Sequence, residues 1–378
     1  MDLSRRSIET ILENQADSGA YVASPNFAVY RYCWLRDGSF TAHAIDRAGE
    51  HESARAFFRW VDRTIRAHAW KVEAVLRKTE QGLPIDEGDW LHTRYTLDGK
   101  ETQAEWWDFQ LDGYGTWLWA LKEHIESSGD VTFLAEVATS VELTVRYLSA
   151  LWNRPNYDCW EENAEYLHPY SLAAIFGGLR SAEGLARQSG ISSLAPEPGL
   201  TERLRTFVLD HGVHEGYVVK SFPPRGQPYT RVHEVAMSVD ASLLGLATPF
   251  RLLTPDDQLM RKTVALVEDD LHFAGGVHRY QTDTYYGGGE WVLLTAWLGW
   301  YYAELGQTSR AAELLRWVEA QADAGGLLPE QVSGHLLAPA YYAKWIGKWG
   351  PVAKPLLWSH AMYLILFSVL GSGGRCTR

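Results

Sequence analysis

Cysteine is scarce in this chain: the 378 residues contain only Cys33, Cys159 and Cys376. An odd number without a repeated metal-ligand spacing indicates neither a disulfide framework nor a zinc site. Reduced thiols in a cytoplasm explain the three residues best, so we expect a cytoplasmic protein. No histidine forms a recognisable dyad with Cys33 or Cys159, which argues against a cysteine nucleophile.

Basic charge and long apolar runs are also lacking. Lys and Arg number 35 against 47 Asp and Glu, which gives a formal net charge of −12. This balance argues against a nucleic-acid partner, because phosphates require basic surface, and it favours a neutral substrate. No apolar run reaches the ~18 residues of a membrane span, so no membrane partner is expected. Residues 1–6 lead into an amphipathic stretch and not into the apolar core of a secretory signal.

Aromatic residues, in contrast, are abundant. The chain has 17 Trp and 19 Tyr. Part of this excess belongs to the core, because aromatic side chains bury large areas. The remainder exceeds what packing needs, and flat indole and phenol rings are suited to stacking on the apolar faces of sugars. The composition therefore indicates a carbohydrate ligand.

Helical periodicity dominates the sequence, and strand-like alternation is confined to residues 213–219 and short pieces near the motifs. The pattern predicts an all-α protein of about twelve helices, with the usual error at their boundaries. The predicted ranges are 4–13, 37–48, 53–67, 113–125, 131–151, 170–185, 200–209, 238–246, 258–271, 291–305, 309–322 and 356–370.

Two separated carboxylate motifs indicate a candidate chemistry. They are Trp160-Glu161-Glu162 and, far along the chain, Pro329-Glu330-Gln331. Hydrolysing a glycosidic bond with inversion requires one protonated acid at the leaving oxygen and one ionised base that holds a water on the other face of the sugar. With 47 acidic residues, accidental pairs are common, so solvated loop carboxylates remain the alternative.

Further motifs favour a catalytic pair over solvated loop carboxylates. They are Tyr30-Arg31-Tyr32-Cys33-Trp34-Leu35-Arg36-Asp37, the run from Trp106-Trp107-Asp108 to Gly115, Arg279 to Tyr286 with Trp291, and Leu357-Trp358-Ser359. In this order and spacing, from about residue 20 to 370, the set resembles the catalytic domain of glycoside hydrolase family 15, the glucoamylases and their relatives. The resemblance implies an (α/α)6 barrel with six inner and six outer helices. We expect one catalytic domain over residues 1–378, without an N-terminal β-sandwich and without a starch-binding domain.

The resemblance also implies roles for individual residues. Glu161 would be the general acid, Glu330 the general base, and Glu162 a ligand of the +1 sugar; the alternative exchanges Glu161 and Glu162. Arg36 and Asp37 would bind O4 and O6 of the terminal glucose, unless they form only a surface salt bridge. Further substrate contacts are implied for Tyr30, Trp34, Trp106, Trp160, Arg279 and Trp358, although tryptophans are often only core, with Gln110 and Asp112 supporting the site from behind.

The predicted function is therefore an inverting, exo-acting α-glucoside hydrolase that releases β-glucose from the non-reducing end of short α-glucosides. Isomaltose or small isomalto-oligosaccharides are the first expectation, with an α-1,4-specific glucoamylase-type or a trehalose-hydrolysing enzyme as alternatives. Neither a metal nor another cofactor is needed, because carboxylates carry both proton transfers. A non-catalytic glycan-binding barrel is the alternative of another class. Residues 335–354 are unusually aromatic, so the +1 subsite and the linkage preference stay open, as does the oligomeric state.

Overall fold

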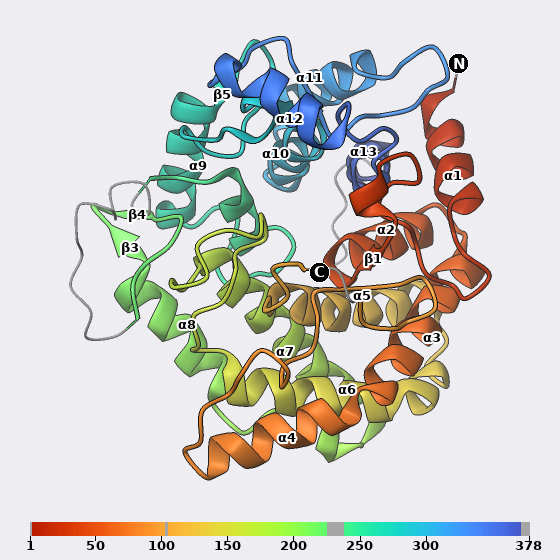
Figure 1. The fold of residues 1–378 in the computed structure, drawn as a ribbon, viewed down its shortest axis with the longest axis vertical. Helices are drawn as coiled ribbons and strands as arrows, with labels where there is room; N and C mark the ends of the chain where they lie inside the picture. The colour runs from red at the N-terminus through yellow and green to blue at the C-terminus, as the bar shows by residue number, and fades with distance from the viewer. Residues whose placement is uncertain (1, 103–104, 225–237, 372–378) are drawn as a thin grey trace.

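The computed structural model describes residues 2–102, 105–224 and 238–371, and their helices form two concentric rings (Figure 1). Each inner helix contacts the next one along the chain, and the last inner helix contacts the first, so the inner ring is closed. Its members are α2 (Leu35–Arg47), α5 (Asp112–Ser128), α7 (Pro169–Ser189), the 3-10 helix η4 (Ala241–Leu246), α10 (Val292–Glu304) and α13 (Leu357–Gly371).

The outer ring alternates with the inner one along the sequence. Its helices are α1 (Leu3–Glu13), α3 (His51–Ala67), α6 (Phe133–Leu151), α8 (Leu200–His211), α9 (Gln258–Leu271) and α11 (Thr308–Ala320). Because inner and outer helices alternate, the loops that lead into the inner helices meet at one end of the barrel. The predicted all-α (α/α)6 barrel is confirmed.

Burial explains which helices are inside. In α10 every residue from Val292 to Ala303 is buried, as expected for a helix that is apolar all round. Helices α5 and α7 approach so closely that a Cβ on Gly115 would lie 2.2 Å from the carbonyl oxygen of Ala174. Only glycine allows this backbone contact, which holds two neighbouring inner helices together.

Three elements differ from the predicted pattern. Helix α4 (Ala69–Glu80) follows α3 with only His68 between them, so no turn signal separates the two in the sequence. Helix α12 (Tyr342–Trp349) has eight residues, which is too short for a clear helical period. The α-helix predicted over 238–246 is the short 3-10 helix η4, and Pro249 three residues later disfavours a continued helix.

Short strands brace the loops at the mouth of the barrel. Strand β1 (Cys33–Trp34) pairs with β2 (Arg94–Tyr95), and β3 (Val213–His214) forms a hairpin with β4 (Tyr217–Val218), within the alternating stretch 213–219. A four-stranded antiparallel sheet has the order β5 (His272–Phe273), β6 (Gly276–Val277), β7 (Glu290–Trp291) and β8 (Gln331–Val332).

Short 3-10 helices complete the described elements: η1 (Ala28–Tyr30), η2 (Ser192–Leu194), η5 (Tyr285–Gly287) and η6 (Pro339–Tyr341). In the part of the chain that the structure describes, no helix is both long and apolar enough to span a bilayer. Cys33 and Cys159 are buried free thiols, and Cys376 lies outside the described residues.

Candidate active site

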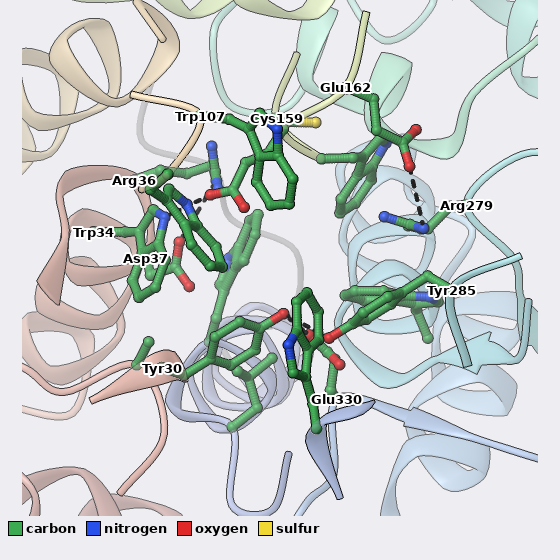
Figure 2. A pocket seen from close by; sticks show the side chains of 18 of the residues that line it. Tyr30, Trp34, Arg36, Asp37, Trp107, Cys159, Glu162, Arg279, Tyr285 and Glu330 are labelled. Carbon is green, nitrogen blue, oxygen red and sulfur yellow. Dashed lines mark hydrogen bonds and ion pairs between the residues drawn. The ribbon is translucent and has the colours of Figure 1, made fainter. Parts of the chain in front are cut away.

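A pocket of about 240 Å³ opens at the mouth of the barrel, and Figure 2 shows its walls. All eleven residues predicted to act or to bind substrate line it, although they come from segments between residues 30 and 358: Tyr30, Trp34, Arg36, Asp37, Trp106, Trp160, Glu161, Glu162, Arg279, Glu330 and Trp358. Gln110 and Asp112 do not line the pocket but lie behind Arg36. Glu161 and Glu330 therefore share one pocket and are not separate solvated loop carboxylates.

Glu161 lies in a tight turn of the loop that precedes α7. Its backbone is in the left-handed region, with φ of 68°. The indole Nε1 of Trp34 donates a hydrogen bond of 2.7 Å to Glu161 Oε1. Burial raises the pKa of Glu161, opposed by the charge on Arg36 and by indole hydrogen bonds. A raised pKa favours the protonated form of the carboxyl group.

Glu330 lies immediately before β8, where its backbone N–H donates to the carbonyl of Ala353 at 2.9 Å. The hydroxyl of Tyr30 donates to Glu330 Oε1 at 3.0 Å. The other oxygen, Oε2, is buried and has no hydrogen-bond partner among the described residues. Burial raises the pKa of Glu330 to about 8, while the Tyr30 hydrogen bond and the charge on Arg279 oppose this rise. The free oxygen is positioned to accept a proton from a water.

Arg36 and Asp37 lie in the first turn of helix α2; the Arg36 side chain is buried and that of Asp37 is only 14% exposed, so the surface salt-bridge alternative is wrong. Arg36 donates to Gln110 Oε1 at 3.0 Å and to Asp112 Oδ2 at 2.9 Å, which fixes its guanidinium plane. Its Nε lies 3.5 Å from Asp37 Oδ2, and neither atom has a hydrogen-bond partner among the described residues. One unused donor beside one unused acceptor matches a pair of sugar hydroxyls. Burial raises the pKa of Asp37 to about 6, against the charge on Arg36.

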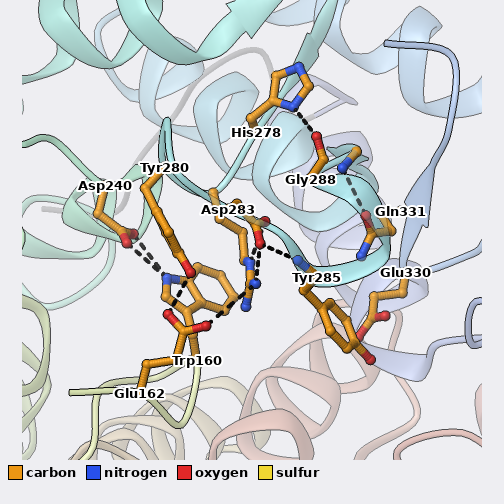
Figure 3. A network of polar contacts seen from close by, with 12 residues as sticks. Trp160, Glu162, Asp240, His278, Tyr280, Asp283, Tyr285, Gly288, Glu330 and Gln331 are labelled. Carbon is orange, nitrogen blue, oxygen red and sulfur yellow. Dashed lines mark hydrogen bonds and ion pairs between the residues drawn. The ribbon is translucent and has the colours of Figure 1, made fainter. Parts of the chain in front are cut away.

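Glu162 faces a second cation on the other side of the pocket. Its carboxylate accepts a hydrogen bond of 2.6 Å from Tyr280 and lies 3.8 Å from Arg279. Asp283 accepts two hydrogen bonds from Arg279, at 2.7 and 2.5 Å, and one from the backbone of Tyr285 (Figure 3). Asp283 therefore orders this loop and does not line the pocket.

The predicted tryptophans both line the pocket and pack against their neighbours. Trp34 lies edge-on to Trp106, and the Trp358 ring stacks on Phe40 beneath the Arg36 guanidinium. The indole of Trp160 donates to both carboxylate oxygens of Asp240 at 3.1 and 3.0 Å. These tryptophans are therefore not only core residues.

Several lining residues were not among the predicted substrate contacts, among them Trp107, Cys159, Thr284, Tyr285, Trp345 and Trp349. Trp345 and Trp349 come from α12, and the aromatic richness of residues 335–354 is the signal that indicates them. Tyr342, from the same segment, packs on Tyr286 instead. Tyr285 lies within the motif Arg279 to Tyr286, but no role was predicted for it; its hydroxyl lies 2.9 Å from that of Tyr30. Among the described residues, no group of three His, Cys, Asp or Glu is placed to hold a metal ion.

Comparison with known proteins places the chain in a family. The family model of glycosyl hydrolases family 15 matches residues 2–368. An isomaltose glucohydrolase from Kribbella flavida is 44% identical over 98% of this chain and 93% of its own length. A glycosidase variant solved in complex with glucose is 43% identical, covers 98% of this chain and 96% of its own, and superposes with a TM-score of 0.89.

A bacterial glucoamylase solved with acarbose shares the fold at 20% identity, with a TM-score of 0.74 over 98% of this chain and 55% of its own. The family match extends over nearly the whole chain and includes every pocket residue described above. The chain belongs to glycosyl hydrolases family 15, and it is a glycoside hydrolase.

Proposed function

We propose that this protein removes one glucose from the non-reducing end of a short α-glucoside with inversion, releasing β-glucose. The observation that carries the proposal is the pair of carboxyl groups in one pocket with different surroundings. Burial raises the pKa of both groups, but Glu161 accepts a hydrogen bond from the indole of Trp34, whereas Glu330 accepts one from Tyr30 and has one unpartnered oxygen. An acid and a water-binding base are the two groups that an inverting glycosidase needs.

The residue roles form part of this proposal. Glu161 protonates the leaving oxygen, and Glu330 takes a proton from the attacking water. Arg36 and Asp37 bind two hydroxyls of the terminal glucose, so that the −1 sugar has no room to continue the chain. Glu162 and Arg279 contact the +1 sugar. One catalytic domain over residues 1–378 and a cytoplasmic location also belong to this proposal.

The proposed substrate is isomaltose or a small isomalto-oligosaccharide. The support is the 44% identity over 98% of the chain to a protein named isomaltose glucohydrolase, and the glucose bound to a 43% identical glycosidase. Aromatic side chains also narrow the pocket: the rings of Trp106 and Trp349 stack with centroids 6.4 Å apart. A narrow mouth favours a disaccharide over a polymer.

A comparison of kcat/KM on isomaltose, maltose, nigerose and trehalose tests the substrate, and NMR of the fresh product tests the stereochemistry. We expect isomaltose to be the best of the four and β-glucose to appear first. A preference for maltose or trehalose would favour the α-1,4-specific or the trehalose-hydrolysing alternative. α-Glucose appearing first would contradict inversion.

A further inference from the structure

A lysine that no sequence motif indicates is buried behind the pocket. Lys220 follows β4 and is only 4% exposed. Its Nζ lies 2.9 Å from Asp240 Oδ2 and 3.6 Å from Asp158 Oδ2, and none of these three residues lines the pocket. The two aspartates raise the pKa of Lys220 despite its burial, so the side chain remains a cation. A buried charge requires such partners, because an unpaired one is strongly destabilising.

The two aspartates hold the turn that carries the proposed general acid. Asp158 Oδ1 accepts hydrogen bonds from the backbone N–H groups of Trp160 and Glu162, both at 2.9 Å. Asp240 accepts the indole N–H of Trp160 with both oxygens (Figure 3). The residues on both sides of Glu161 are therefore fixed by the two carboxylates that Lys220 pairs. Glu161 itself has a positive φ, a conformation that a non-glycine residue adopts only where its surroundings impose it.

The same cation also reaches the residue proposed to face the +1 sugar. Lys220 Nζ lies 3.9 Å from Glu162 Oε2 and 3.3 Å from the ring centroid of Tyr280. Tyr280 in turn donates its hydroxyl hydrogen bond to Glu162. Among the described residues, Lys220 forms no ion pair with Glu330 or Asp37 and does not contact Arg36, and these three form the other half of the pocket.

We propose that Lys220 is a positioning residue for the leaving-group half of the active site. Through Asp158 and Asp240 it holds the Trp160–Glu162 turn that aims Glu161, and through Tyr280 and Glu162 it orders the +1 subsite. This inference rests on the proposed function, because it takes Glu161 as the acid and Glu162 as the +1 ligand.

The inference predicts that a Lys220 variant distinguishes substrates by their leaving group. Isomaltose needs a proton from Glu161 and places a sugar in the +1 subsite. α-Glucosyl fluoride depends less on the proton from Glu161, because fluoride is a weak base. It also depends less on the +1 subsite, because its leaving group is a single atom. Lys220→Met should lower kcat/KM on isomaltose by about 10²-fold or more, the scale of lost general acid catalysis, but lower it on α-glucosyl fluoride by less than about tenfold. Lys220→Arg should recover part of the loss.

The matched control is Lys262→Met, which removes an exposed lysine on α9 and should leave both substrates unaffected. Lys220→Met leaves two buried aspartates without their cation. The double variant Lys220→Met/Asp240→Asn, which removes one charge of each sign, is therefore measured in parallel. It should show the same selective loss. Thermal denaturation reports whether each variant is folded.

An equal loss on both substrates, or no loss on isomaltose, would overturn the inference. Failure of both the single and the double variant to fold would also overturn it, because the cation would then serve the fold and not the turn. Failure of the proposed function is a separate result: the wild-type enzyme would hydrolyse none of the α-glucosides in the substrate panel.

Discussion

Tyr30 lies between two hydrogen-bonding partners, with its hydroxyl oxygen 3.0 Å from Glu330 Oε1 and 2.9 Å from the hydroxyl oxygen of Tyr285. A carboxylate only accepts, so Tyr30 donates to Glu330 and is left to accept from Tyr285. This chain of hydroxyl groups favours the ionised form of Glu330 against the effect of burial. The ionisation of the proposed base therefore depends in part on Tyr285, for which no role was predicted.

The pH dependence of activity should report the hydrogen bonds that link Tyr285, Tyr30 and Glu330. The base acts when ionised, so kcat/KM should fall as the pH drops through the pKa of Glu330, about 8 in the free enzyme. Tyr285→Phe removes a hydrogen bond that lowers this pKa, so this limb of the profile should move to higher pH. Tyr286→Phe is the control, because its hydroxyl donates to the carbonyl of Gly350. A limb that stays in place in Tyr285→Phe would contradict the assignment.

The acid and base roles can be tested by isosteric changes. Glu161→Gln and Glu330→Gln should each lower kcat on isomaltose by about 10²–10⁴-fold, the usual worth of a general acid or base. Steady-state kinetics measures the loss, and an unchanged circular dichroism spectrum excludes misfolding. Glu162→Gln distinguishes the alternative order of the two adjacent glutamates: it should mainly raise KM. A larger loss of kcat in Glu162→Gln than in Glu161→Gln would exchange their roles.

The pair formed by Arg36 and Asp37 should determine binding of the terminal glucose. Asp37→Ala removes a buried carboxylate acceptor and should weaken transition-state binding by about 1.5–3 kcal/mol, measured as a fall in kcat/KM. Thr41→Ala, in the next turn of α2, is a control, because the Thr41 hydroxyl donates to a backbone carbonyl in its own helix. Equal kcat/KM values in Asp37→Ala and the wild type would show that Asp37 does not bind the terminal glucose.

The chain-length limit should depend on α12. Trp349→Ala removes one ring of the stacked pair with Trp106, so kcat/KM on isomaltotriose should rise relative to that on isomaltose. Trp70→Ala removes a tryptophan that is 60% exposed on α4 and serves as the control. An unchanged ratio in Trp349→Ala would show that the aromatic mouth does not set the limit.

Stability should decrease in acid because buried histidines are held neutral. His360 Nε2 accepts from the backbone of Leu328 and its Nδ1 lies 2.8 Å from Ser7 Oγ, an arrangement that only the neutral ring satisfies. Burial lowers the pKa of His360 from 6.5 to about 3. Between these pH values the unfolded chain binds a proton at this residue and the folded chain does not. Its contribution, up to on the order of 4 kcal/mol, is complete above pH 6.5 and is lost as the pH falls towards 3.

Unfolding free energies between pH 4 and 8 check this prediction. The decrease towards low pH should be smaller in His360→Gln, although that variant is less stable at pH 7. Identical slopes in the variant and the wild type would show that His360 does not contribute. His51→Gln, at a more exposed site on α3, is the control.

The sequence predicts the eleven α-helices of the two rings because each is long enough to show a helical period, whereas the six-residue 3-10 helix η4 was predicted as an α-helix. It misses α12 because eight residues are too few for such a period. The candidate site is predicted where motifs surround it, as at Trp160-Glu161-Glu162. Lys220 and the role of Tyr285 within its motif are missed because their importance arises from distances between remote segments. No local pattern records that Lys220 will lie between Asp158 and Asp240.

Closure of the inner ring by α13 has a consequence for synthesis on the ribosome. When residue 330 has been added, both proposed catalytic residues are present in the chain. Helix α2 still lacks its contact with α13, and the pocket still lacks the wall formed by Trp358. The backbone of Leu357 must also reach the carbonyl of Ala23, 334 positions earlier, before the two ends of the barrel are joined. A nascent chain should therefore remain inactive until its last helix emerges, and a separately expressed final helix should restore activity to a truncated chain.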